Sequence, residues 1–332
     1  MINIDQKVAE HVCSGDSELS KDILLSSKPL VLRGLADSWP LVTAEKTSHA
    51  AFLAKLTEYH SGEPVVIYEG LAEEDNRVFY NKDLTGFNFQ PAQCDFSAFC
   101  NRLVEHKKLL YMGSTMVDRW FPKLRSENPI SLTGIDPLVS LWLGNQSRIA
   151  AHCDFPQNLA VVVAGNRRFT LFPPDQLENL YIGPLDYTPA GQAISLVDFH
   201  APDFSTYPRF EEALKNAVVA ELAPGDGIII PSMWWHHVEG LSQVNGLVNY
   251  WWRTSPGYLG NPMLALKLAM LSIGQLPEAQ KQAWRSHFEH FVFNNSDEHL
   301  AHIPRPQQGI AGGIDETQAR QLRAELLNKL NR

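Results

Sequence analysis

The sequence is poor in cysteine, in positive charge and in long apolar runs. Its 332 residues include four cysteines, and no two of them form a CxxC pair. This excludes a disulfide scaffold, and we expect reduced, intracellular thiols. No apolar run approaches the roughly 20 residues that cross a bilayer, and the first residues lack the apolar core of a signal peptide. We therefore expect a cytoplasmic protein without membrane association.

The charge balance is acidic. Lys and Arg together number 28 against 37 Asp and Glu, which gives a formal net charge of −9. General binders of nucleic acid need positive faces to displace counterions, so this balance weighs against tRNA as a partner. The sequence also has no GxGxxG after a strand, no GxxxxGK[ST] loop and no GxSxG elbow. With cysteine this sparse, the 12 histidines are the expected source of any metal site.

Short β runs separated by Pro and Gly turns fill residues 109–252. Such a pattern predicts a sandwich, barrel or jelly roll, and it argues against a βαβ array. The first hundred residues mix strand-like runs with helical patterns, including one helix predicted over 44–60. Further helices are predicted after residue 256, near 261–274, 277–292 and 315–331. We therefore predict a mainly β protein with helical additions.

His152 and Asp154 are candidate metal ligands. Residues two apart on a strand share a face, so both side chains can point into one cavity. A third ligand must come from a distant strand, and the run GDGIIIPSMWWHHV offers His236 or His237. Two histidines and one carboxylate on one face form a facial triad, which is typical of non-haem Fe(II) oxygenases. Alternation alone leaves the choice between the two later histidines open.

The stretch from about Tyr111 to Trp252 resembles the JmjC-type, cupin-like (cupin 8) oxygenases that depend on Fe(II) and 2-oxoglutarate. Four segments carry the resemblance: AHCDFPQN, FTLFPPDQLENLY, PGDGIIIPSMWWHHVE and VNYWW. The sequence is most similar to the group of the hypoxia-inducible factor asparaginyl hydroxylase and its bacterial cupin-like relatives, for which KPLVLRGLADSWP is also typical. The resemblance implies a double-stranded β-helix (jelly-roll) catalytic domain at 106–258. An N-terminal α/β elaboration would occupy 1–105, and C-terminal helices 259–332.

The resemblance also implies which residues bind the metal. In the family the distal ligand directly follows the Trp pair, which selects His236 to complete the site with His152 and Asp154. The Fe(II) ion would take 2-oxoglutarate as co-substrate. Relatives place a lysine for its far carboxylate where this chain has Arg167, and an arginine can grip a carboxylate with two hydrogen bonds.

Other family positions near the co-substrate correspond to Tyr111, Asn158 and Asn249. One departure is Ile149, which stands where relatives commonly carry a threonine, three residues before the first histidine. Ser147 or Thr115 is expected to supply the missing hydroxyl.

Three residues are candidates for contacting the substrate. Trp251 matches a family position near the metal, and Phe155 and Gln157 follow Asp154 at the expected entrance. The resemblance implies a hydroxylase that couples oxidative decarboxylation of 2-oxoglutarate, with dioxygen, to hydroxylation of a protein or peptide side chain.

Several alternatives stay open. The substrate could be a small metabolite or a modified nucleoside. A non-catalytic metal-binding cupin and a zinc cupin isomerase are the other classes. In relatives the C-terminal helices form a dimer interface, so we expect a homodimer through 259–332.

Overall fold

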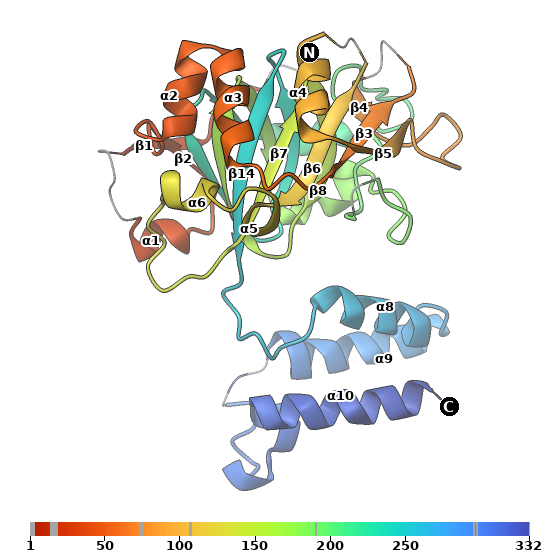
Figure 1. The fold of residues 1–332 in the computed structure, drawn as a ribbon. Coiled ribbons are helices and arrows are strands. Elements are labelled where there is room, and N and C mark those ends of the chain that lie inside the picture. The colour runs from red at the N-terminus through yellow and green to blue at the C-terminus, as the bar shows by residue number, and fades with distance from the viewer. Residues whose placement is uncertain are drawn as a thin grey trace. The chain divides into compact units, whose positions relative to one another are not determined.

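The computed structural model describes residues 4–331, apart from 14–18, 73–75, 106–107, 190, 295 and 297. The chain divides into two compact units, Met1–Thr254 and Ser255–Arg332. The first unit contains two β-sheets, with helices against the outer face of the larger one (Figure 1). Among the described helices, none combines the length and apolarity needed to span a membrane.

The larger sheet has nine strands within the described residues. Neighbouring strands are antiparallel except for the first pair, which is parallel. Their spatial order is β1 (Ala9–Val12), β2 (Leu30–Arg33), β12 (Gly227–Ile230), β9 (Gln157–Ala164), β14 (Asn245–Trp252), β7 (Leu138–Gly144), β6 (Leu110–Met116), β3 (Val65–Gly70) and β5 (Phe89–Cys94).

The smaller sheet has five strands within the same residues. Their order is β11 (Val218–Leu222), β10 (Arg167–Phe172), β13 (Trp235–Gly240), β8 (Ser147–Cys153) and β4 (Arg77–Val78). From β7 to β14 the chain passes repeatedly from one sheet to the other, which is how a jelly roll is built. The predicted mainly β fold with a jelly-roll core is therefore confirmed.

The larger sheet is apolar on both faces, because each face is covered. Leu247 of β14 lies in a buried cluster between the sheets, together with Phe169 of β10. Val248, the next residue along β14, lies in a second cluster with Phe52 and other helical residues. The strict alternation of β14 thus sends its odd-numbered residues, including Asn249 and Trp251, toward the space between the sheets.

The single helix predicted over 44–60 is wrong, since two helices occupy this segment. They are α2 (Pro40–Thr47) and α3 (His49–Tyr59). Ser48 separates them in an extended conformation (φ −173°), and its hydroxyl caps α3 by accepting a hydrogen bond from the Ala51 amide. The other helical elements of this unit are α1 (Lys21–Leu24), α4 (Phe96–Glu105), α5 (Val117–Trp120), α6 (Leu124–Glu127), α7 (Phe210–Lys215) and a 3₁₀ helix over Pro174–Leu180.

The second unit is helical, as predicted. It contains α8 (Pro262–Ile273), α9 (Glu278–Phe288), a π-helical turn over Glu289–Phe293, 3₁₀ turns at Arg305–Gln307 and Gly309–Gly312, and α10 (Glu316–Leu330). A capping box between Asp315 and Gln318 begins α10. The predicted boundary after residue 105 adjoins 106–107, which lie outside the described residues, and the division into three domains stays a prediction.

Candidate functional site

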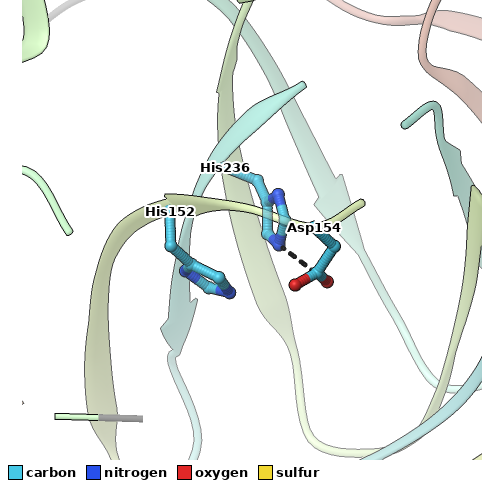
Figure 2. Close-up of side chains that lie close together, drawn as sticks. All are labelled: His152, Asp154 and His236. Carbon is cyan, nitrogen blue, oxygen red and sulfur yellow. Dashed lines mark ion pairs between the residues drawn. The ribbon is translucent and has the colours of Figure 1, made fainter. Parts of the chain in front are cut away.

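Three candidate ligand side chains converge from β8 and β13 (Figure 2). His152 lies in β8, Asp154 follows that strand, and His236 pairs with His152 across the ladder. Their ligand atoms all lie within 4.8 Å of one another. The imidazole centroids are 4.2 Å apart, and Nε2 of His236 is 3.8 Å from an Asp154 carboxylate oxygen. This donor set of two imidazoles and one carboxylate fits a single Fe(II) ion.

The backbone fixes the orientation of both imidazoles. Nδ1 of His152 lies 2.9 Å from the carbonyl oxygen of Ala150, and Nδ1 of His236 lies 3.0 Å from that of Trp234. Since a carbonyl can only accept, each Nδ1 carries the proton and each Nε2 keeps its lone pair. A backbone carbonyl that fixes the tautomer in this way is a common feature of metal-binding histidines.

Burial keeps the distal imidazole neutral. Burial and, second, the neighbouring His152 lower the pKa of His236 to about 4, while the Asp154 carboxylate opposes this shift. Near neutral pH the His236 ring is therefore unprotonated, and its lone pair is available to a cation.

His237 faces away from the other ligands. Its ring lies 4.6 Å from that of Phe199 in a cluster on the outer face of the smaller sheet. Burial, and next the positive charge of Arg77, lower the pKa of His237 to about 3. The structure thus brings His236, and not His237, to His152.

A β-bulge shapes the wall next to the ligands. In the pairing of β8 with β13, His236 lies opposite His152 but Val238 lies opposite Ile149, so the register shifts between them. The extra residue changes the alternation of β8. Ile149 and His152, three residues apart, consequently both line the cavity beside the ligands.

This cavity has a volume of about 380 Å³ and lies between the sheets. Most of the residues predicted for the site line it: His152, Asp154, His236, Tyr111, Asn158, Arg167, Asn249 and Trp251. Sequence reasoning missed other lining residues, among them Ser114, Trp142 and Leu247. Alternation along β14 from Trp251 could have identified Leu247, because the two residues are four apart on one strand.

Arg167 is a buried cation in the cavity wall. Its side chain is 2% exposed, and it forms no ion pair with a carboxylate among the described residues. Its Nε atom has no hydrogen-bond partner in the same part of the chain, and burial lowers the pKa of the guanidinium. Arg168 points to the opposite face, with Glu221 at 3.7 Å and Glu239 at 4.0 Å. An unpaired, desolvated guanidinium beside a cavity is suited to bind a carboxylate.

Neutral polar groups complete the wall. Asn249 donates a hydrogen bond from Nδ2 to Oδ1 of Asn158 at 2.7 Å, while its own Oδ1 is buried and has no partner among the residues that the structure describes. Burial raises the pKa of the Tyr111 hydroxyl, which therefore remains a protonated donor near neutral pH.

Three of the residues predicted for the site do not line the cavity, namely Thr115, Phe155 and Gln157. In β6 a register shift between Met112 and Thr115, with φ of 43° at Ser114, turns Ser114 toward the cavity in place of Thr115. Phe155 stacks beneath the Arg253 guanidinium at 5.2 Å. The side chain of Gln157 accepts a hydrogen bond from the Ser232 amide at 3.1 Å. Neither Phe155 nor Gln157 is placed where it contacts the cavity directly.

Comparison with known proteins agrees with this architecture. Residues 16–258 match the family model described as "Cupin-like domain". The chain is 33% identical over 124 residues to the lysine-specific demethylase JMJ31 of Arabidopsis thaliana (37% of this chain, 22% of that protein). It is 29% identical over 233 residues to lysine-specific demethylase 8 of Xenopus tropicalis (69% and 49%). It is 32% identical over 120 residues to tRNA wybutosine-synthesizing protein 5 of Danio rerio (36% and 31%). The matches thus span half or less of each of these relatives.

Proposed function

The chain belongs to the cupin-like domain family, and on this premise we propose that it is an Fe(II)- and 2-oxoglutarate-dependent dioxygenase that hydroxylates a protein or peptide side chain. The observation that supports this best is that Arg167, which is buried and has no acidic partner among the described residues, lines the same cavity as the convergent His152, Asp154 and His236. Binding of a metal requires only the three ligands. A buried cation such as Arg167 is needed only if an anion, here 2-oxoglutarate, binds in the cavity as well.

The three ligand residues would hold Fe(II) through the two Nε2 atoms and the Asp154 carboxylate. When bound, Fe(II) supplies coordination sites for 2-oxoglutarate and dioxygen, and with them the oxidation that yields succinate, carbon dioxide and a hydroxylated substrate. The chain contributes neutral, oriented imidazoles and walls such as Val78, Ile149 and Phe169 that exclude water from the cavity.

Arg167 would bind the far carboxylate of 2-oxoglutarate with its guanidinium. The Tyr111 hydroxyl, protonated and in the same lining, can donate a further hydrogen bond to that carboxylate. Arg167 departs from the lysine of relatives but keeps the charge. Ile149 supplies no hydroxyl, and Ser114 is the hydroxyl residue that the bulge of β6 brings to the lining.

A substrate side chain would enter beside Trp251, which lines the cavity next to the triad. The volume of about 380 Å³ lies near the lower end of the range for ligand pockets, roughly 300–1,000 Å³. Since 2-oxoglutarate would share this space, only a small part of a substrate can enter. This favours a single side chain of a protein or peptide, or a small metabolite, over a whole modified nucleoside. The acidic net charge of −9 also argues against a nucleoside that is part of a nucleic acid.

The main alternative is a non-catalytic cupin that binds a metal and serves as an interaction module. Ile149, which stands where relatives carry a threonine hydroxyl, is the residue that favours this alternative.

The experiment that tests the proposed function is to load the purified chain with Fe(II) without oxygen, add 2-oxoglutarate and air, and measure succinate. We expect succinate from the wild type and none above background from His152→Ala. The matched control is His287→Ala, which removes an exposed histidine of α9 whose Nδ1 also meets a backbone carbonyl. Absence of both 2-oxoglutarate binding and succinate in the wild type would favour the module.

We also propose that the second unit forms a homodimer. Leu264 and Leu271 on α8 are 66% and 77% exposed, and α10 carries a further exposed row with Leu327 and Leu330. Several large apolar side chains left exposed on one helical unit are typical of interaction surfaces. Light scattering after size exclusion should give twice the chain mass, and Leu264→Glu combined with Leu271→Glu should give the monomer.

A further inference from the structure

We propose that Ser232 and Gln157 are positioning residues that hold the two halves of the metal site together. They fix the distance between Asp154 and His236, and thereby the affinity of the site for its metal. This inference rests on the proposed function in one respect only, namely that the triad binds a divalent cation.

Three hydrogen bonds join the segment after β8 to the turn before β13. The Met233 amide donates to the carbonyl oxygen of Asp154 at 2.8 Å. The Ser232 amide donates to Oε1 of Gln157 at 3.1 Å, and the Ser232 hydroxyl donates to the carbonyl oxygen of Phe155 at 2.6 Å. We call these three bonds the staple. One of the residues that it ties down, Asp154, is itself a candidate ligand.

The stapled turn is strained, so it depends on these contacts. The Trp234 amide donates to the carbonyl oxygen of Pro231 at 3.1 Å, which closes a four-residue turn. Its third residue, Met233, has φ of 66°, a conformation that normally selects glycine. A methionine holds such a conformation only where its surroundings over-determine it. Without the staple the turn is expected to relax toward ordinary backbone angles.

Relaxation of the turn would reach the metal through the distal imidazole. The carbonyl group of Trp234, the last residue of the turn, accepts the hydrogen bond from Nδ1 of His236. The orientation of this carbonyl therefore sets the direction in which Nε2 points. Loss of a group that orients a metal ligand typically weakens metal binding by about 10- to 100-fold.

The experiment is a calorimetric titration of the metal-free chain of 332 residues with Co(II), together with its Tm without metal. We expect Ser232→Ala to lower the Co(II) affinity by about 10- to 100-fold, and Ser232→Thr, which keeps the hydroxyl, to restore it. Gln157→Leu removes another bond of the staple and should also weaken Co(II) binding, so it serves if Ser232→Ala does not fold. The matched control is Ser272→Ala, which deletes a hydroxyl bonded at 2.7 Å to the Leu268 carbonyl of α8.

The outcomes separate this inference from the proposed function. Wild-type Co(II) affinity in both Ser232→Ala and Gln157→Leu would refute the staple, even if the Tm fell, because that is the result of a purely structural role. Equal weakening in Ser232→Thr and Ser232→Ala would refute the part assigned to the hydroxyl. If the wild type itself bound no Co(II), the metal site and the staple would both be refuted.

Discussion

Replacing Arg167 by methionine tests the co-substrate site most directly, because the substitution removes the charge and keeps much of the side-chain length. Arg167 is 2% exposed, so solvent would screen the interaction of its guanidinium with a bound carboxylate only weakly. Leaving one partner of a buried ion pair uncompensated costs about 3–5 kcal/mol. At about 1.4 kcal/mol for each factor of ten, 2-oxoglutarate should bind Arg167→Met about 100-fold to a few thousand-fold more weakly than the wild type.

The same substitution should not destabilise the protein that has no metal or anion bound. Without an anion, Arg167 is a desolvated cation with no acidic partner among the described residues, which disfavours the folded state. We therefore expect metal-free Arg167→Met to unfold at a Tm equal to or above that of the wild type. A residue with a structural role would lower both the affinity and the Tm, so the two measurements together separate the roles.

The assay is a calorimetric titration of 2-oxoglutarate into chain loaded with Mn(II), with thermal unfolding of the metal-free forms alongside. Arg168→Met is the matched control, because Arg168 lies next to Arg167 on β10 but points to Glu221 and Glu239 on the other face. It should bind 2-oxoglutarate as the wild type does. Binding by Arg167→Met within a few-fold of the wild type would contradict the assignment of Arg167.

Two further predictions concern stability. The metal-free chain should lose stability as the pH falls from about 6.5 to about 4, by roughly 3 kcal/mol from His236 alone, and the buried His237, whose pKa is about 3, adds to this loss. The reason is that the pKa of His236 is about 4 in the folded chain, so the unfolded chain binds a proton at a higher pH than the folded chain does. Urea unfolding at several pH values measures the free energy of unfolding, and a value that does not change with pH would contradict the prediction. Gly165→Ala should destabilise the fold by more than about 1 kcal/mol. Gly165 has φ of 65°, and a Cβ there would lie 2.3 Å from the carbonyl oxygen of Val244; an unchanged urea midpoint would contradict it.

Strand alternation could be read from the sequence wherever the pairing is regular. Alternation along β10 puts Arg167 and Phe169 on one face and Arg168 on the other, and this is how they lie in the structure. Asn249 and Trp251 are assigned from the family resemblance, and their spacing of two residues agrees with their common face on β14. In both strands the two faces pack against different layers, so a shift by one residue would bury the wrong side chains.

Alternation could not be read across the bulges. In β6 the register shift after Met112 turns Ser114, not Thr115, toward the cavity. In β8 the shift brings Ile149 to the same wall as His152. A bulge depends on how a strand pairs with its neighbour. In β6, Gly113 lies within the shifted stretch and is a residue type that favours a bulge, whereas β8 contains no Gly or Pro that would indicate one. The break between α2 and α3 differs, because Ser48 is a good N-cap residue and could have been recognised.

The balance between stability and binding distinguishes a catalytic cupin from a metal-binding module. A module needs only neutral, oriented imidazoles and a carboxylate, and His152, His236 and Asp154 already provide them. It gains nothing from Arg167, whose burial without a counter-charge disfavours the folded state. Such a residue is compatible with a stable protein only if the fold offsets its cost or a ligand neutralises it. Saturating 2-oxoglutarate with Mn(II) should therefore raise the Tm of the wild type more than Mn(II) alone, and should do so much less in Arg167→Met. If 2-oxoglutarate raised the Tm of both proteins equally, the buried guanidinium would have no role in binding it, and a non-catalytic metal-binding module would be favoured.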